Sequence, residues 1–210
     1  MKIPAAVVTA LLTLALAGDA PARRDVPAFA VGVVEGVLAV ADEVVPRARF
    51  DEVLGATPVP TLQAIANDPG LDVGVRLRAV RALGFYRLPE SREALHGVIS
   101  ARGGCDGDGV AVTGTPLLFV RAVLESLGAI GDPDDVGRIT PCLQAKSRDL
   151  RVAAARALRD LGASTAVCPL QHQRDVETVP QVQSAISEAL RRWPAQICSR
   201  PPVRPNVAAE

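Results

Sequence analysis

The stretch Arg76-Leu-Arg-Ala-Val-Arg-Ala-Leu83-Gly84 decides the fold, because three later segments of the chain follow the same pattern. These segments are Val120-Arg-Ala-Val-Leu-Glu-Ser-Leu127-Gly128, Arg151-Val-Ala-Ala-Ala-Arg-Ala-Leu158 and Gln183-Ser-Ala-Ile-Ser-Glu-Ala-Leu190. Their shared leucines, at 83, 127, 158 and 190, are 44, 31 and 32 residues apart. A period near this length, with apolar residues at helical spacing inside each copy, is typical of a helical solenoid. We therefore predict an all-α fold, an α-solenoid of stacked helical hairpins.

Proline, glycine and aspartate residues between the apolar segments set the expected helix boundaries. In each hairpin we name the first helix A and the second helix B. The A helices are predicted over 73–87, 116–127 and 150–161, the B helices over 89–100, 133–145 and 164–174, and further helices over 50–54, 61–66 and 180–193. The expected N-caps are Asp132 for the second B helix, Asp149 or Ser147 for the third A helix, and Ser164 for the third B helix. A glycine-rich insertion over 102–115 accounts for the long first spacing.

Residues 1–22 have the pattern of a secretory signal peptide. Lys2 supplies a positive charge and residues 3–16 are apolar, a run shorter than the about 20 residues that a membrane-spanning helix needs. Cleavage is expected after one of three alanines, Ala17, Ala20 or Ala22. Asp19 stands where a bacterial lipoprotein carries its lipidated cysteine. We therefore expect a soluble secreted or periplasmic protein with no membrane anchor.

The rest of the chain divides into a cap, a repeat domain and a tail. Residues 26–60 are expected to form an N-terminal helical cap, because the end unit of a solenoid has no neighbour to cover its apolar face. The apolar positions of the cap fall on one helical face, whereas Gly32, Gly36 and many valines point toward a strand; we favour a helix. Residues 61–198 are assigned to the repeat domain and 199–210 to a flexible, proline-rich tail.

Charge and composition bear on the class of partner. The chain carries 23 basic and 23 acidic side chains. The net charge of the chain is therefore zero and gives no long-range attraction to nucleic acid or to an anionic membrane. We expect neither as a partner. Apolar residues make up 49% of the chain and aromatic residues 3%, which predicts a core of closely packed alanine, valine and leucine.

Four cysteines, Cys105, Cys142, Cys168 and Cys198, are expected to form two disulfides. An even number of cysteines in an exported protein favours disulfides, and no Cys-x-x-Cys spacing indicates a zinc site or a redox motif. If A and B helices alternate in direction, Cys105 and Cys142 lie at one end of the helices and Cys168 and Cys198 near the other. Crossed pairs would span a helix length, far beyond the about 5.5 Å between disulfide Cα atoms. We predict Cys105–Cys142 and Cys168–Cys198; the alternative is four free buried thiols.

Two motifs occupy positions that a known family uses. Gly131-Asp-Pro-Asp-Asp-Val136 lies between two predicted helices, and Asp149-Leu-Arg-Val-Ala-Ala-Ala-Arg-Ala-Leu-Arg-Asp-Leu-Gly162 lies along an A helix. Val-Arg pairs stand near the start of two other A helices, at 75–76 and 120–121. In these residues the chain resembles HEAT repeats, in particular the short bacterial form related to phycobilisome lyase HEAT-like repeats. The likeness covers about residues 61–193, although the glycine-rich insertion departs from the pattern, and it implies a scaffold, an adaptor or a binding surface.

No catalytic, cofactor-binding or metal-binding residue is predicted. The segment Asp106-Gly-Asp108-Gly109 is similar to the beginning of a calcium loop, but it lacks the later acidic ligands of such loops. Turn chemistry explains the segment equally well. His96 and His172 are not spaced as metal ligands, and each is expected to be a lone, partly exposed side chain. No Gly-x-Ser-x-Gly elbow, phosphate loop or paired catalytic motif is present.

Arginines recur along the A helices, at Arg76, Arg78, Arg81, Arg121, Arg151, Arg156 and Arg159. One interpretation is a basic ridge for an acidic partner. We favour a solvated face of ion pairs, because acidic residues are interleaved with the basic ones. The expected acidic partners are Asp72, Glu125, Asp149 and Asp160.

These patterns together predict a non-enzymatic protein-interaction or scaffold module without a cofactor. The expected partner is an unidentified protein, held against a concave face lined by the B helices. One alternative is an enzyme or a lyase-like chaperone, which would need a deep pocket with clustered polar groups, near the insertion. Another alternative is a purely structural envelope protein with no specific partner.

Overall fold

The computed structural model of the chain describes residues 32, 34, 36–38, 45–55, 58–105, 114–194 and 198. The predicted signal peptide over 1–22 and the tail over 199–210 lie outside the described residues. Asp106 and Asp108 of the candidate calcium loop lie outside them as well.

Regular secondary structure in these ranges is entirely helical, which confirms the predicted all-α class. The α-helices are α2 (Arg47–Leu54), α3 (Pro58–Asn67), α4 (Val73–Leu83), α5 (Pro89–Ser100), α6 (Thr115–Ile130), α7 (Val136–Ile139), α8 (Arg148–Leu161), α9 (Val167–Val176) and α10 (Pro180–Leu190). Three short 3-10 segments connect them, η1 (Pro133–Asp135), η2 (Thr140–Gln144) and η3 (Ser164–Ala166). Ahead of α2, Val34 and Leu38 are helical and buried, in agreement with a helix rather than a strand at these positions.

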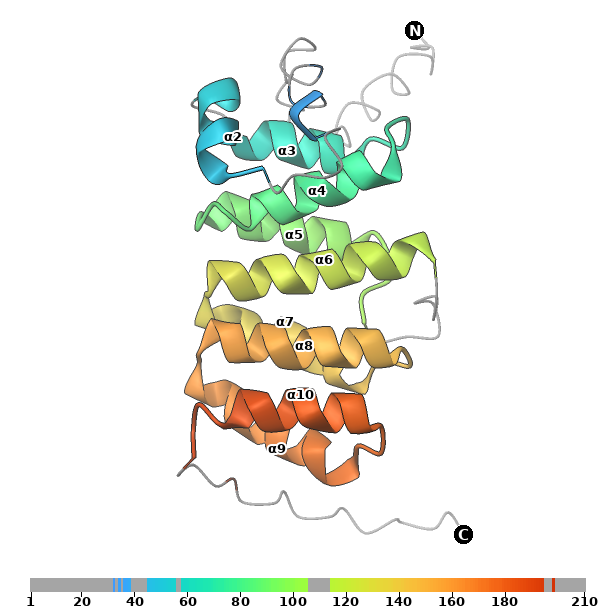
Figure 1. The fold of residues 1–210 in the computed structure, drawn as a ribbon, viewed down its shortest axis with the longest axis vertical. Helices are drawn as coiled ribbons and strands as arrows, with labels where there is room; N and C mark the ends of the chain where they lie inside the picture. The colour runs from blue at the N-terminus through green and yellow to red at the C-terminus, as the bar shows by residue number, and fades with distance from the viewer. Residues whose placement is uncertain are drawn as a thin grey trace, which may run out of the picture.

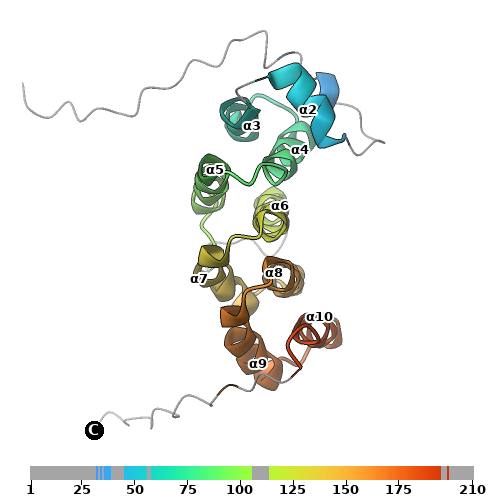
Figure 2. The same cartoon turned by 90° about the vertical axis from the view of Figure 1, so that its left-hand side faces the viewer.

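The helices from α3 onward lie in two columns (Figures 1 and 2). One column contains α4, α6, α8 and α10, each packed on the next. The other contains α3, α5, α7 and α9. The columns bend gently, and α4, α6, α8 and α10 lie on the inner side of the bend (Figure 2). The predicted A helices therefore form one layer and the predicted B helices the other.

The leucines that align the four sequence copies are buried in α4, α6, α8 and α10. Leu83, Leu127, Leu158 and Leu190 are 0, 1, 0 and 8% exposed. The residues four positions before them, Ala79, Val123, Ala154 and Ile186, are all fully buried. Positions i and i+4 share one face of a helix. The four helices therefore present the same two sequence positions to the core.

Two glycines allow neighbouring helices of this column to approach closely. A Cβ atom at Gly84 would lie 3.0 Å from the Cα of Ser126 on α6, and one at Gly128 would lie 2.9 Å from the Cα of Ala157 on α8. Each glycine directly follows an aligned leucine, and each contacted residue directly precedes one. The step from α4 to α6 thus has the same register as the step from α6 to α8.

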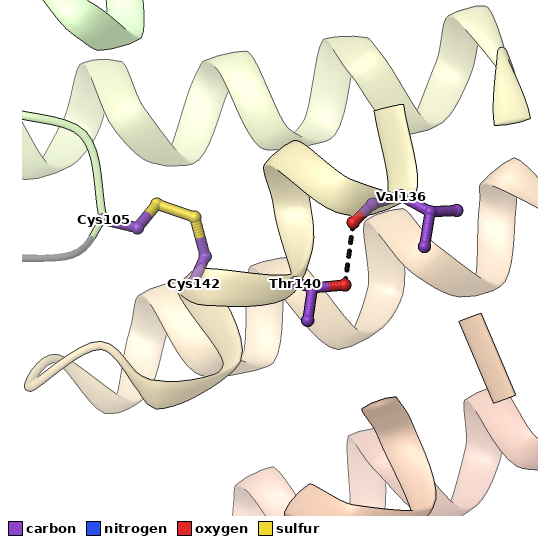
Figure 3. Close-up of a disulfide and its surroundings, with 4 residues drawn as sticks. All are labelled: Cys105, Val136, Thr140 and Cys142. Carbon is purple, nitrogen blue, oxygen red and sulfur yellow. Dashed lines mark hydrogen bonds between the residues drawn. A yellow bond between two sulfur atoms is a disulfide. The ribbon is translucent and has the colours of Figure 1, made fainter. Parts of the chain in front are cut away.

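The segment predicted as one B helix over 133–145 is instead broken into η1, α7 and η2. Pro141 has no N–H to donate to the carbonyl of Gly137, so regular α-helical bonding cannot continue through it. Next to it, Thr140 Oγ1 donates a hydrogen bond to the Val136 carbonyl at 2.7 Å (Figure 3). Such side-chain bonds often accompany a bend in a helix. The break turns the chain into η2, which carries Cys142.

Both predicted disulfides are present. Cys105 follows α5 and is joined to Cys142 in η2, with 4.8 Å between the Cα atoms (Figure 3). Cys168 in α9 is joined to Cys198, which follows α10, with 5.3 Å between the Cα atoms. The first bridge joins two members of one column, and the second joins Cys198, which follows α10, to α9.

Some helix ends differ from the predicted ones. Helix α4 ends at Leu83 rather than at residue 87, and Gly84 holds its C-cap position. Helix α6 continues to Ile130, where Gly131 in the left-handed conformation terminates it. Helix α10 ends at Leu190 rather than at residue 193.

The predicted N-caps are confirmed in part. Asp132 precedes η1 and accepts a hydrogen bond from the N–H of Asp134. Ser147 holds the N-cap position of α8 but makes no capping hydrogen bond. The prediction for Ser164 is wrong, because this residue lies inside η3 and Ala163 precedes it.

Candidate functional site

An open groove of about 680 Å³ crosses three successive helices of one column, α6, α8 and α10. These helices are stacked one below another in Figure 1. The binding face was expected on the B helices, whereas this groove lies on A helices. The A helices line the inner side of the bend in Figure 2, so the expected concave face is made by the other layer.

Small side chains of α8 form the floor of the groove. Val152, Ala153 and Ala157 line it, and the Cα of Ala157 would lie 2.9 Å from a Cβ atom added at Gly128 of α6. Pro180, Gln181 and Ser184 of α10 form one wall. The floor is therefore apolar, and this wall offers hydroxyl and amide groups to a bound molecule.

Most charged groups of the groove are already paired. On α6, Arg121 Nε donates to the Glu125 carboxylate at 2.8 Å. Arg81 Nε of the neighbouring helix α4 lies 3.4 Å from the same carboxylate. On α8, Arg159 contacts Asp160 at 2.8 Å and Glu188 at 2.6 Å. The hydrogen bond to Asp160 is the largest factor that raises the pKa of Arg159. These pairs are exposed, and pairs of this kind contribute little to stability, about 0.2–1 kcal/mol.

Arg156 is the exception in the groove. It is an exposed residue of α8 that lines the groove, and no carboxylate among the described residues lies within ion-pair distance of it. Its guanidinium carries five N–H donors and a permanent charge. The groove therefore has one cation in position to pair with a group from outside.

The predicted ion pairs of the A-helix arginines are confirmed in part. Glu125 and Asp160 pair as expected. The prediction for Asp72 is wrong, because its carboxylate caps α4 by accepting from the N–H groups of residues 74 and 75. Asp149 lies 3.6 Å from Arg148, a residue outside the predicted set. Arg76 and Arg78 donate to backbone carbonyls, those of Ala66 and Leu38.

A second polar cluster connects α5 to η1. The Asp135 carboxylate, 0% exposed, accepts hydrogen bonds from Arg92 at 2.9 and 3.1 Å and lies 2.8 Å from His96 Nε2. Arg92 also contacts Asp132. The hydrogen bond to Asp135 is the largest factor that raises the pKa of Arg92. His96, predicted to be a lone side chain, is therefore paired, and its side chain is only 16% exposed.

The Arg92 cluster does not have the composition of a hydrolytic triad. A triad needs a nucleophilic hydroxyl or thiol hydrogen-bonded to the histidine. Among the described residues, the only hydrogen-bond partner of the His96 ring is Asp135. The cluster instead links two segments that are about 40 residues apart in the sequence. It has a structural role, and we call such a cluster of buried ion pairs a brace.

A third cluster surrounds Glu177 at the end of α9. Its carboxylate, 3% exposed, accepts from Arg151 at 2.8 and 3.1 Å, from Gln173 at 3.1 Å and from the Val179 N–H at 3.0 Å. Burial alone raises the pKa of this carboxyl, but the hydrogen bonds from Arg151, Val179 and Gln173 outweigh burial and lower the pKa to about 2. This cluster connects α8, α9 and the start of α10, as the Arg92 cluster connects α5 and η1.

The remaining candidates from the sequence give no site. The Nε2 atom of His172 is buried and has no hydrogen-bond partner among the residues that the structure describes. Within the ranges that the structure describes, no group of three or more histidine, cysteine, aspartate or glutamate side chains is arranged to hold a metal ion. In the same ranges, no helix is both long enough and apolar enough to cross a bilayer.

No protein-family model matches the chain, and no curated protein matches it. The resemblance to HEAT repeats therefore rests on the sequence motifs.

Proposed function

We propose that this chain is a non-enzymatic protein-interaction or scaffold module, exported from the cytoplasm and built as an α-solenoid of HEAT-like units. The equivalent burial of the four aligned leucines supports this architecture. The matching close contacts at Gly84 and Gly128 support it independently, because they give two successive helix steps the same register. In a solenoid each unit contacts only its neighbours, and the exposed faces of successive units form an extended surface.

The groove across α6, α8 and α10 carries the functional proposal. Three successive A helices contribute to it, so it is a product of the stacking and not of any single hairpin. Its floor is apolar and its ion pairs are exposed, so a partner can cover the groove without leaving a buried charge unpaired. Arg156 supplies the one unpaired cation among the described residues that line it.

The chemistry of the groove specifies the partner in part. We infer a protein segment that places an aspartate or glutamate opposite Arg156 and apolar side chains on Val152 and Ala153. Gln181 and Ser184 are exposed and in position to bond the backbone of such a segment. A charge-assisted bond to arginine gives the contact direction and specificity.

The geometry favours binding over catalysis. The groove is open, and most of its charged groups neutralise one another. A hydrolytic site needs a nucleophile, a base and an oxyanion donor arranged around one point, in a place that excludes water. The described residues of the groove bring together no such set.

Export is supported by the two disulfides. Disulfides persist in oxidising compartments and are rare in the cytosol. Determination of the N-terminus of the native protein in the extracytoplasmic fraction tests this part: a start after residue 17, 20 or 22 supports export, and an intact start at residue 1 in the cytosol contradicts it.

The interaction is tested by photo-cross-linking in the cell that makes the protein. A benzophenone amino acid replaces Gln181 in the groove, or Glu93, an exposed residue of α5 in the other column, as the control position. The probe at 181 is expected to form one discrete adduct whose partner peptide carries an acidic residue. The substitution Arg156→Glu should abolish the adduct, whereas Arg138→Glu, at an exposed position of α7, should leave it unchanged.

Two outcomes would contradict the proposal. One is an adduct of equal yield from positions 181 and 93. The other is an adduct at 181 that persists in the Arg156→Glu variant. An absence of any discrete adduct would favour a purely structural envelope protein.

A further inference from the structure

Two arginines lie against the ring of Phe119, away from the groove. Phe119 belongs to α6 and is 1% exposed. The guanidinium carbon of Arg102, just after α5, lies 3.9 Å from the centre of its ring, and that of Arg76, on α4, lies 5.1 Å from it. The two guanidinium carbons are therefore at most about 9 Å apart, the sum of those distances. Each is held by a cation–π contact and by one backbone acceptor.

Neither arginine has an acidic partner among the described residues. Arg102 Nη1 donates to the Val98 carbonyl at 2.8 Å, and Arg76 Nε donates to the Ala66 carbonyl at 3.4 Å. A guanidinium has five N–H donors, so most donors of both side chains are left for another acceptor. Burial lowers the pKa of Arg102, and the charge of Arg76 lowers it further. The two partly buried cations thus repel each other.

Two other partly buried arginines of the chain are arranged differently. Arg92 is paired through two nitrogens with Asp135, and Arg151 is paired in the same way with Glu177. Both carboxylates are buried and lie on a neighbouring segment. The chain thus neutralises a partly buried arginine with a bidentate carboxylate at two places, and it supplies no such group at Arg76 and Arg102 among the described residues.

We propose that Arg76 and Arg102, held against Phe119, form a binding site for a small oxyanion of the phosphate or carboxylate class. An oxyanion between the two guanidiniums accepts paired N–H···O bonds, for which the planar fork of arginine is suited. Its charge replaces the repulsion between the cations with two attractions. Partial burial strengthens those attractions, because the pair is less screened than an exposed one.

The position of the site suits a bound ligand that is not the protein partner. It lies where α4, α6 and the end of α5 meet, whereas the groove is formed by α6, α8 and α10. Arg102 precedes Cys105 by three residues, and the bridge to Cys142 fixes the end of that segment. The inference does not depend on the groove or on its partner.

Isothermal titration of the disulfide-bonded mature protein with inorganic phosphate tests the site, with acetate in a parallel titration for the carboxylate class. Sodium chloride at matched ionic strength is the control for screening. We expect saturable binding of at least one of the two anions. The substitutions Arg76→Gln and Arg102→Gln should each weaken it at least about tenfold, as expected for the loss of a charge-assisted pair of bonds. The matched control is Arg138→Gln, which removes an exposed cation of α7 outside both the groove and this site and should leave the affinity unchanged.

A second variant protects the test against loss of the fold. Arg102→Lys keeps the charge and the aliphatic stem but not the fork, and circular dichroism confirms that each variant is folded before titration. A folded Arg102→Lys protein should bind the anion more weakly than the wild type. Two results would overturn the proposal: no binding of either anion above the chloride control, or equal weakening by Arg138→Gln.

Discussion

The ion pairs of this protein fall into two groups that differ in burial. In the α5–η1 and α8–α9 braces the carboxylates of Asp135 and Glu177 are 0 and 3% exposed, and each accepts several hydrogen bonds. In the groove, Arg121 and Glu125 are 44 and 38% exposed and are neighbours on one turn of α6. A buried carboxylate cannot be released to water without a large cost, whereas an exposed pair exchanges its partner for water or for another charge. The braces therefore fix how the segments pack, and the groove is free to be covered by another molecule.

The largest expected effect is at the α8–α9 brace. The substitution Glu177→Gln removes a charge that neutralises Arg151 and leaves that guanidinium partly buried without a counter-ion. Breaking a buried pair in this way costs about 3–5 kcal/mol. The control is Glu125→Gln on the exposed pair, which should cost at most about 1 kcal/mol. Urea unfolding of the two variants measures the loss in unfolding free energy that each substitution causes. Equal losses would contradict the distinction between brace and groove.

Acid should weaken the same brace. The pKa of Glu177 is lowered from its ordinary value of 4.5 to about 2 in the folded protein, so between these values the unfolded chain binds more protons than the folded one. The stabilisation is therefore complete above pH 4.5 and is lost as the pH falls through about 2. At 1.36 kcal/mol per pKa unit the contribution is about 3 kcal/mol. Unfolding free energies measured between pH 6 and 2 should fall less steeply in Glu177→Gln than in the wild type; parallel curves would exclude this carboxylate as the cause.

Each disulfide should contribute somewhat less to the unfolding free energy than the α8–α9 brace. They close loops of similar length, with sequence separations of 37 and 30 residues. The chain-entropy model then predicts losses of about 2–4 kcal/mol for each double replacement, Cys105→Ala with Cys142→Ala or Cys168→Ala with Cys198→Ala. Thermal unfolding of the two double variants and of the reduced wild type checks this. Transitions unchanged by reduction would mean that the bridges do not constrain the chain.

The close approach of α6 and α8 gives the smallest of these effects. The substitution Gly128→Ala would place a Cβ atom 2.9 Å from the Cα of Ala157, so the helices must move apart. Overpacking of this kind costs about 1–3 kcal/mol. Gly137→Ala in α7 is the matched control, since nothing lies within 4 Å of its added Cβ, and it should be neutral or stabilising by up to about 1 kcal/mol. Equal destabilisation by both would show that the contact at Gly128 is not tight.

The helices could be predicted from the sequence because their determinants are local. Apolar residues at helical spacing identified the four aligned leucines, and the alternation of helices led to the correct cysteine pairs. The break at Pro141 has a local cause as well, the missing N–H of proline, and it could have been read from the sequence. The prediction of an uninterrupted helix over 133–145 overlooked it.

The polar clusters could not be predicted in the same way. His96 meets Asp135 across 39 residues, and Arg151 meets Glu177 across 26. Such contacts depend on how α5 and α8 are rotated against the segments beside them, and no periodicity within either segment encodes that rotation. The groove could not be predicted either, because the curvature of the columns decides which layer lies on the inner side. That curvature also depends on how the helices pack, which no local pattern encodes.

The most direct test of the groove as the binding surface is to measure partner affinity and unfolding free energy on one variant. Once cross-linking has identified the partner, Arg156→Glu should weaken its binding at least about tenfold while the unfolding free energy changes by less than about 0.5 kcal/mol, as for an exposed residue. Arg138→Glu should change neither quantity. An Arg156→Glu protein that binds as tightly as the wild type, or that loses binding only because it unfolds, would contradict the assignment of the groove.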